Sequence, residues 1–263
     1  MRRLTLALVF VLTICRPSQA AFTHVTGQSI YSYTNAAAAT SFTVSLPNNP
    51  TAGNLVCVAS IWYNGGTSNP GVVAIKDGSL NVYQLSPSSP VINIAAGDGT
   101  AILAYLVVPA GASKAITITT VNNIGSSGVI TLWVGEFNDS SGTPGFYQDA
   151  VGTDSGTPSV TVSTPTIPVS GTANLLFALC IPDTTIVSAN GVWTALVASG
   201  AGSLPNVGGP GDAAVYDLSA SSATALNLTQ NTSGNWGSIG MSFTPTSAAV
   251  TCPQTLRLLG VGC

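Results

Sequence analysis

The chain has 263 residues, of which 45% are hydrophobic and only 6% are charged, against roughly 25% charged residues in ordinary globular domains. This apolar content is enough for a buried core, so the low charge does not indicate disorder. Six Lys and Arg against nine Asp and Glu give a net charge of −3. A chain with so few cations has no basic surface for a phosphate backbone, which excludes nucleic acid as a partner.

Residues 1–21 have the pattern of a signal peptide. Arg2 and Arg3 precede an apolar run over residues 4–14, and Ser18-Gln19-Ala20 ends in small residues of the type that a signal peptidase accepts. The run is too short to span a bilayer, and no later stretch of about 18 apolar residues predicts a membrane span. We therefore expect an exported protein, either secreted, held at the cell surface, or periplasmic.

From residue 22 onward, short β-branched runs are separated by Gly, Pro, Asn and Ser, and no helical periodicity of useful length occurs. Thirteen such runs predict an all-β, antiparallel β-sandwich of the jelly-roll or Ig-like kind, or a barrel. The predicted strands are residues 41–46, 55–63, 72–76, 81–85, 101–108, 115–121, 129–137, 159–163, 175–181, 193–198, 213–218, 225–229 and 237–244.

The hydrophobic pattern divides these strands into two kinds. Residues 43–46 and 115–119 alternate apolar and hydroxyl side chains, which predicts strands with one buried and one wet face. Residues 55–62, 102–108 and 175–181 are apolar at nearly every position, which in an antiparallel sheet indicates that both faces are covered. The most economical cover for the second face is another part of the same chain.

Two stretches about 120 residues apart resemble each other. Residues 53–62 and 172–181 both continue from a Pro-containing turn into an apolar strand, and residues 99–105 and 135–137 have weaker counterparts at 211–216 and 241–243. We therefore expect two similar β-sandwich units packed into one body. The predicted units are residues 22–141 and 146–246, with a C-terminal tail over 247–263.

Three further landmarks support this architecture. They are the opening strand Ala52 to Val56, Tyr105 in a mid-chain strand, and Glu136-Phe137 at the end of an apolar strand before Gly142. This pattern resembles uncharacterised exported bacterial β-sandwich proteins. The resemblance implies the fold and export, and it carries over no catalytic residue.

Catalytic candidates are few. His24 is the only histidine and no Gly-x-Ser-x-Gly turn occurs, so a Ser-His-Asp hydrolase is not indicated and His24 is expected to be an exposed residue near the mature N-terminus. Glu136, the only glutamate, follows an apolar run and could act on a glycosidic bond if an aspartate lay opposite it. The partner would be Asp77, Asp98, Asp139 or another aspartate. The structural alternative is a strand-end carboxylate that accepts hydrogen bonds from backbone amides or pairs with a lysine.

Aromatic residues beside Asn and Gly are candidates for ligand binding. A flat ring at a loop edge can stack on a sugar while neighbouring amides bind its hydroxyls. The candidates are Trp62, Tyr63, Trp193 and Trp236. The alternative for each tryptophan is a cap over the end of the sandwich core, and Trp133, inside a strand, is predicted to lie in the core.

The sequence offers candidates for a calcium site and for one disulfide. No cofactor is expected, although Asp98 and Asp212 precede corresponding strands and are candidates for calcium, with an Asx turn as the alternative. Cys252 and Cys263 enclose ten residues and are predicted to form a disulfide in an oxidising compartment. Cys57 and Cys180 lie at odd and even offsets in the two similar strands, so we expect them on opposite faces, as buried free thiols.

Three functions are compatible with these features. The leading hypothesis is an exported, non-catalytic protein that binds a polysaccharide or another cell-surface partner. The second is a carbohydrate-active hydrolase or lyase that uses Glu136 with an aspartate. The third is a structural surface protein that assembles with itself through its sheet edges.

Overall fold

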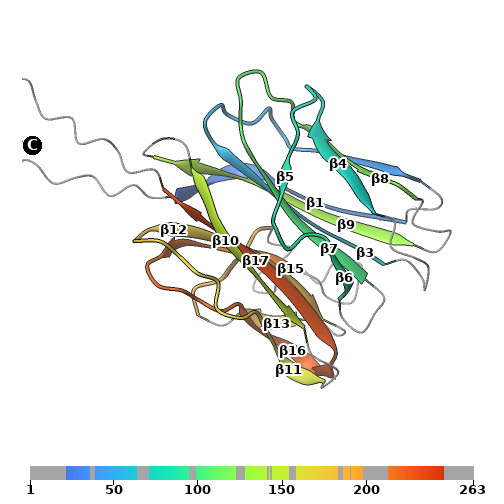
Figure 1. The fold of residues 1–263 in the computed structure, drawn as a ribbon, viewed down its shortest axis with the longest axis vertical. Helices are drawn as coiled ribbons and strands as arrows, with labels where there is room; N and C mark the ends of the chain where they lie inside the picture. Colours follow the sequence, from blue (N-terminus) through green and yellow to red (C-terminus); the bar gives the residue numbers. More distant parts are fainter. Residues whose placement is uncertain are drawn as a thin grey trace, which may run out of the picture.

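The computed structural model describes residues 22–35, 39–63, 71–94, 99–122, 128–140, 142, 144–153, 158–182, 186–189, 191–197 and 213–245. Throughout these ranges the chain forms antiparallel β-sheets joined by turns, with no helix (Figure 1). The fold class is therefore all-β, as predicted. Within the same ranges, no helix is long and apolar enough to cross a membrane.

The first half of the chain forms two sheets, named here inner sheet 1 and outer sheet 1. Inner sheet 1 has the order β1 (Phe22–Asn35), β9 (Val129–Asp139), β3 (Leu55–Tyr63), β7 (Gly99–Val107) and β5 (Gln84–Leu85), with β6 (Val91–Ile94) also paired to β7. Outer sheet 1 has the order β2 (Ser41–Ser45), β8 (Ala115–Thr120) and β4 (Val72–Asp77).

The second half forms two sheets in the same way. Inner sheet 2 has the order β10 (Gly145–Thr153), β17 (Trp236–Thr244), β12 (Asn174–Pro182), β15 (Ala213–Ala220) and β14 (Thr194–Ala195). Outer sheet 2 has the order β11 (Ser159–Ser163), β16 (Asn227–Gly234) and β13 (Ile186–Ala189).

The two halves use the same strand order. If β1, β2, β3, β4 and β5 are matched to β10, β11, β12, β13 and β14, and β7, β8 and β9 to β15, β16 and β17, both sheets of one half reproduce those of the other. Only β6 has no counterpart among the described strands. The register matches as well, since Leu55 lies opposite Phe137 and Leu175 opposite Phe243.

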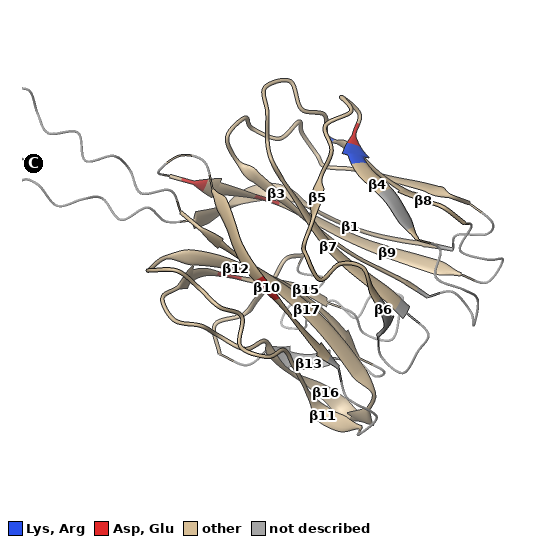
Figure 2. Cartoon of the chain, in the orientation of Figure 1, with Lys and Arg blue, Asp and Glu red and all other residues tan. Residues whose placement is uncertain are grey.

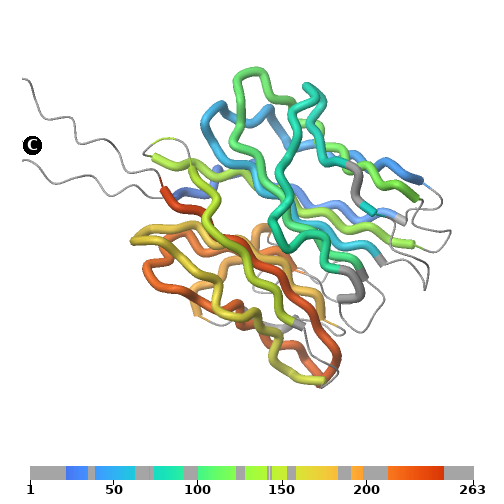
Figure 3. The backbone as a smooth tube through the Cα atoms, in the orientation of Figure 1, coloured from blue at the N-terminus to red at the C-terminus, as the bar shows by residue number. Residues whose placement is uncertain are grey.

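The four sheets are stacked on one another (Figures 1 and 3). Three hydrophobic cores lie between them. Core 1 lies between outer sheet 1 and inner sheet 1, and core 2 between inner sheet 2 and outer sheet 2. The central core joins the two inner sheets, with Trp133 and Phe137 from the first half packed with Phe177 and Phe243 from the second. The two halves are thus held together by a continuous apolar interface.

The central core explains the apolar strands. Along β3, Leu55, Cys57 and Ala59 face the central core, whereas Val56 and Val58 face core 1. Strand β12 is buried at all of its positions and alternates in the same way between the central core and core 2. By contrast, β2 lies in an outer sheet and has every second residue exposed. The prediction of doubly covered and half-wet strands is confirmed.

Four strands were not predicted, namely β1, β6, β10 and β13. Strands β1 and β10 are the outermost strands of the inner sheets. Strand β1 is rich in Ser, Thr and Tyr, β10 contains Gly, Gln, Asp and Thr, and neither contains an apolar run. An edge strand buries little of its surface, so the hydrophobic signal on which the prediction depends is weak there.

Candidate functional site

Glu136 is a fully buried structural carboxylate. Strand β9 places it opposite Val56 of β3, and its side chain has no exposed surface. Its Oε1 accepts hydrogen bonds from the Thr51 amide at 2.8 Å and from Asn54 Nδ2 at 2.5 Å, and its Oε2 accepts one from Gln28 Nε2 at 2.9 Å. The carboxylate therefore joins β1 to the loop before β3, as the structural alternative predicted, with amide groups rather than a lysine as donors.

The partners of Glu136 are themselves held in place. Gln28 exchanges two hydrogen bonds with the backbone of Asn48, at 3.0 and 3.2 Å, and Asn138 Nδ2 donates to Asn54 Oδ1 at 2.8 Å. Such a satisfied network around a buried acid stabilises one loop conformation. It presents no face of the carboxylate to a substrate.

Asp77 does not pair with Glu136 but closes a turn after β4. It accepts hydrogen bonds from the amides of Ser79, Asn81 and Ser113 and from Asn81 Nδ2, at 2.8 to 2.9 Å. Burial alone would raise the pKa of this carboxyl, but the hydrogen bonds from Asn81, Ser113 and Ser79 outweigh burial and hold its pKa below the usual value. Asp98, a candidate both for the partner of Glu136 and for a calcium ligand, lies outside the described residues. Asp212, the second calcium candidate, lies outside them as well.

His24 is half-buried between the two halves, so the expectation of an exposed terminal histidine is wrong. Its ring stacks on Tyr216 of β15, with ring centres 5.2 Å apart, and is tilted against Phe137 at 5.4 Å. Its Nε2 lies 2.6 Å from the Ser29 hydroxyl, and burial lowers the pKa of the imidazole. No carboxylate completes a catalytic arrangement around it among the described contacts.

The tryptophan candidates have different environments. Trp62 has no exposed surface and packs in core 1, so it cannot stack on a ligand and is removed from the predicted binding surface. Trp133 lies in the central core, as expected. Trp236 is partly buried against core 2, and the side chain of Tyr63 lies outside the described part of the chain. Trp193 remains as the candidate beside a hollow.

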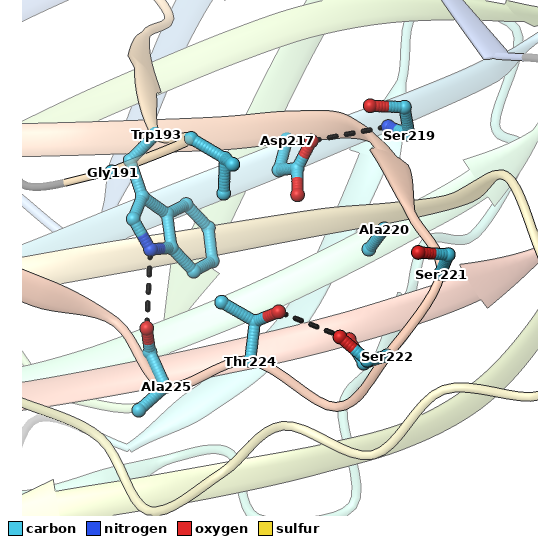
Figure 4. A pocket seen from close by; sticks show the side chains of 10 residues that line it. Gly191, Trp193, Asp217, Ser219, Ala220, Ser221, Ser222, Thr224 and Ala225 are labelled. Carbon is cyan, nitrogen blue, oxygen red and sulfur yellow. Dashed lines mark hydrogen bonds between the residues drawn. The ribbon is translucent and has the colours of Figure 1, made fainter.

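Trp193 precedes β14 and forms one wall of a surface pocket of about 250 Å³ (Figure 4). The indole is 6% exposed, and its Nε1 donates to the carbonyl oxygen of Ala225 at 3.2 Å, which fixes the ring. The opposite walls come from the end of β15 and the segment before β16. Most of the polar lining is hydroxyl, contributed by Ser219, Ser221, Ser222 and Thr224.

Asp217 supplies the only charge in this pocket. It is 6% exposed, and its Oδ1 accepts a hydrogen bond from the Ser219 amide at 3.1 Å. Figure 4 shows its other oxygen pointing into the hollow beside the Trp193 ring. Sequence reasoning missed Asp217. The available signal was a carboxylate within Val215-Tyr216-Asp217-Leu218, an otherwise apolar strand segment.

No metal site is apparent in the described ranges, where no three His, Cys, Asp or Glu side chains gather. Cys57 and Cys180 are buried cysteines without a disulfide, and they face the central core and core 2, respectively, as predicted from their offsets. The predicted disulfide between Cys252 and Cys263 falls outside the described residues.

Comparison of the chain with protein-family models, with curated proteins and with solved structures gives no match. The candidate site is therefore inferred from the geometry of its residues alone. That geometry is a small, open pocket with an indole wall, four hydroxyl-bearing residues in its lining and one nearly buried carboxylate.

Proposed function

We propose that the chain is an exported, non-catalytic protein of two jelly-roll repeats that binds a glycan through the pocket at Trp193. The observation that carries the proposal is the combination of an indole wall with hydroxyl groups and a carboxylate in one hollow. An indole offers apolar surface to a sugar ring, and the polar groups match its hydroxyls. At about 250 Å³, the pocket is smaller than the roughly 300–1,000 Å³ of drug-sized sites, which suits one sugar residue.

The matched strand order supports the two-repeat part of this proposal. Within each half, consecutive strands from β1 to β4, and from β10 to β13, alternate between the two sheets. In an Ig fold the first two strands share a sheet, whereas a jelly roll is built from strands that cross between sheets. The connectivity therefore favours a jelly roll over an Ig-like unit.

The second hypothesis, a hydrolase or lyase that uses Glu136, receives no support from the contacts of this residue. A general acid or nucleophile must reach the substrate, and the Glu136 carboxylate is fully buried and accepts hydrogen bonds from three protein groups. We therefore expect the Glu136→Gln variant to change stability rather than turnover of any glycan.

A glycan array followed by calorimetric titration of the best ligand tests the proposed function. We expect Trp193→Ala to abolish binding, and Trp193→Tyr, which keeps an aromatic wall, to retain part of it. Thermal unfolding of both variants shows whether the fold is kept, and Trp236→Phe is the matched control at a tryptophan away from the pocket lining. An array without any signal, or full binding by Trp193→Ala, contradicts the proposal.

A further inference from the structure

The first half of the chain provides an internal comparison for the pocket. Val56 of β3 pairs with Leu106 of β7, and the matching residue of β12, Leu176, pairs with Asp217 of β15. Asp217 thus occupies the place of Leu106, whose side chain packs against core 1. The same matching places Trp193 where the first half has a buried tyrosine, Tyr83.

This comparison indicates that the fold does not require the carboxylate. A leucine fills the matching position in the first half, and taking a carboxylate out of water without a counter-charge is unfavourable. Asp217 is nevertheless only 6% exposed, and among the described residues its carboxylate accepts one hydrogen bond, from the Ser219 amide. One carboxylate oxygen is thus left for a ligand.

A strand irregularity accompanies the substitution. In the first half, β3 and β7 pair without interruption from Leu55 onward. In the second half, the register of β12 and β15 shifts between Asn174 and Leu176, so that β15 contains one additional residue between Asp217 and Ala220. Bulges of this kind re-aim side chains next to functional sites. Here the Ser219 amide that donates to the Asp217 carboxylate lies within the bulge, between Asp217 and Ala220.

The second half offers no counter-ion for Asp217. Between residues 115 and 256 the sequence contains no Lys, Arg or His, whereas it contains Asp149, Asp154, Asp183, Asp212 and Asp217 in residues 146–246. Figure 2 shows the same asymmetry, with blue segments on the half that carries β4 and none on the half that carries β12. The field of this half attracts cations and repels anions.

From these observations we propose that the pocket recognises the ammonium group of an unsubstituted hexosamine residue. The ammonium group donates hydrogen bonds to the free oxygen of Asp217, the Trp193 ring adds a cation–π contact, and the serine and threonine hydroxyls bind the sugar. This inference depends on the proposed glycan-binding function and narrows it to amino sugars. Neutral sugars bind more weakly, and uronic acids are excluded.

NMR titration with four methyl glycosides tests this inference, namely those of glucosamine, N-acetylglucosamine, glucose and glucuronic acid. We expect the glucosaminide to bind about 10 to 100-fold more tightly than the glucoside, which is the range for a hydrogen bond to a charged group. Asp217→Leu, which installs the residue of the first half, should fold and lose this preference. Asp217→Asn keeps the shape of the side chain but removes its charge and replaces one acceptor oxygen by a donor nitrogen, so it should lose the preference as well. Asp149→Asn is the control with the same change in net charge.

The outcomes separate this inference from the function on which it depends. Equal affinity for the glucosaminide and the glucoside, or an unchanged preference in Asp217→Asn, overturns the amino-sugar assignment while leaving glycan binding intact. Nα-acetyl-lysine methylamide, whose ε-ammonium group is free, is titrated as a further probe. If it binds more tightly than the glucosaminide at the same site, the amino-sugar assignment is overturned in favour of a protein lysine. No response to any of the glycosides overturns the amino-sugar assignment, and if the glycan array is also without signal the proposed function itself is refuted.

Discussion

The sharpest test of the fold is the removal of the buried carboxylate at Glu136. In Glu136→Ala, the Thr51 amide, Asn54 Nδ2 and Gln28 Nε2 all lose their acceptor, while Asn54 and Gln28 are only 4% and 6% exposed. A hydrogen bond to a charged group contributes about 1.5–3 kcal/mol, and such contributions are not additive within one network. We therefore expect the free energy of unfolding to fall by about 3–5 kcal/mol.

A second variant separates the hydrogen bonds from the side-chain volume. In Glu136→Gln one oxygen still accepts from Thr51 and Asn54, but the new amide nitrogen meets the donor Gln28 Nε2. This conflict should cost about 1–2 kcal/mol. Adding Gln28→Glu returns an acceptor to this contact, although it removes the bond to the Asn48 carbonyl oxygen. The double variant should therefore recover part of the loss.

Urea denaturation followed by tryptophan fluorescence measures these free energies, and equal m-values would show that the same surface is exposed in each case. A loss below about 1 kcal/mol for Glu136→Ala would refute the role assigned to this carboxylate. A double variant less stable than both single variants would refute the proposed geometry of the contact with Gln28.

Three further substitutions test local features. Ala173 has φ 61°, where its counterpart Gly53 has φ 89°, so Ala173→Gly should raise the free energy of unfolding by about 0.5–1 kcal/mol in urea denaturation. Asp77 has a pKa below 3.8 in the folded state, so its carboxylate stabilises the fold above pH 3.8 and this stabilisation is lost as the pH falls through the folded pKa. The free energy of unfolding, measured by urea denaturation across this acid range, should therefore depend less on pH in Asp77→Asn than in the wild type. Because burial lowers the pKa of His24 below 6.5, the wild type should lose stability relative to His24→Phe as the pH falls below 6.5 toward the folded pKa, which thermal unfolding at pH 7 and pH 5 measures.

The sequence predicted those parts of the fold whose burial is reflected in composition. The continuous apolar runs of β3 and β12 indicated central strands covered on both faces, and the odd and even offsets of Cys57 and Cys180 placed the two thiols in different cores. Both inferences use the two-residue period of a strand, which tertiary contacts do not alter. The edge strands β1 and β10 were missed because their sequences contain no apolar run.

The candidate site was harder to predict because it depends on which faces meet. Trp62 and Trp193 both lie near Asn and Gly in sequence, yet Trp62 is enclosed in core 1 while Trp193 borders a pocket. Periodicity cannot distinguish the two. Asp217 becomes visible as a candidate only when the strand register shows that it replaces Leu106 of the other half.

Comparison of the halves also limits where a ligand can bind. Three polar residues differ from the residue at the equivalent position of the other half. Glu136 is equivalent to Ser242, His24 to Phe146, and Asp217 to Leu106. Glu136 is covered by the groups that donate hydrogen bonds to it. His24 stacks on Tyr216 in the same way as Phe146 stacks on Tyr105, and both aromatic contacts join the two halves. Asp217 lines the pocket at Trp193, whose described lining includes neither Glu136 nor His24. Asp217 is not among the residues of the central core or of core 2, and the proposed ligand contact would give this buried carboxylate the partner that its own half does not supply.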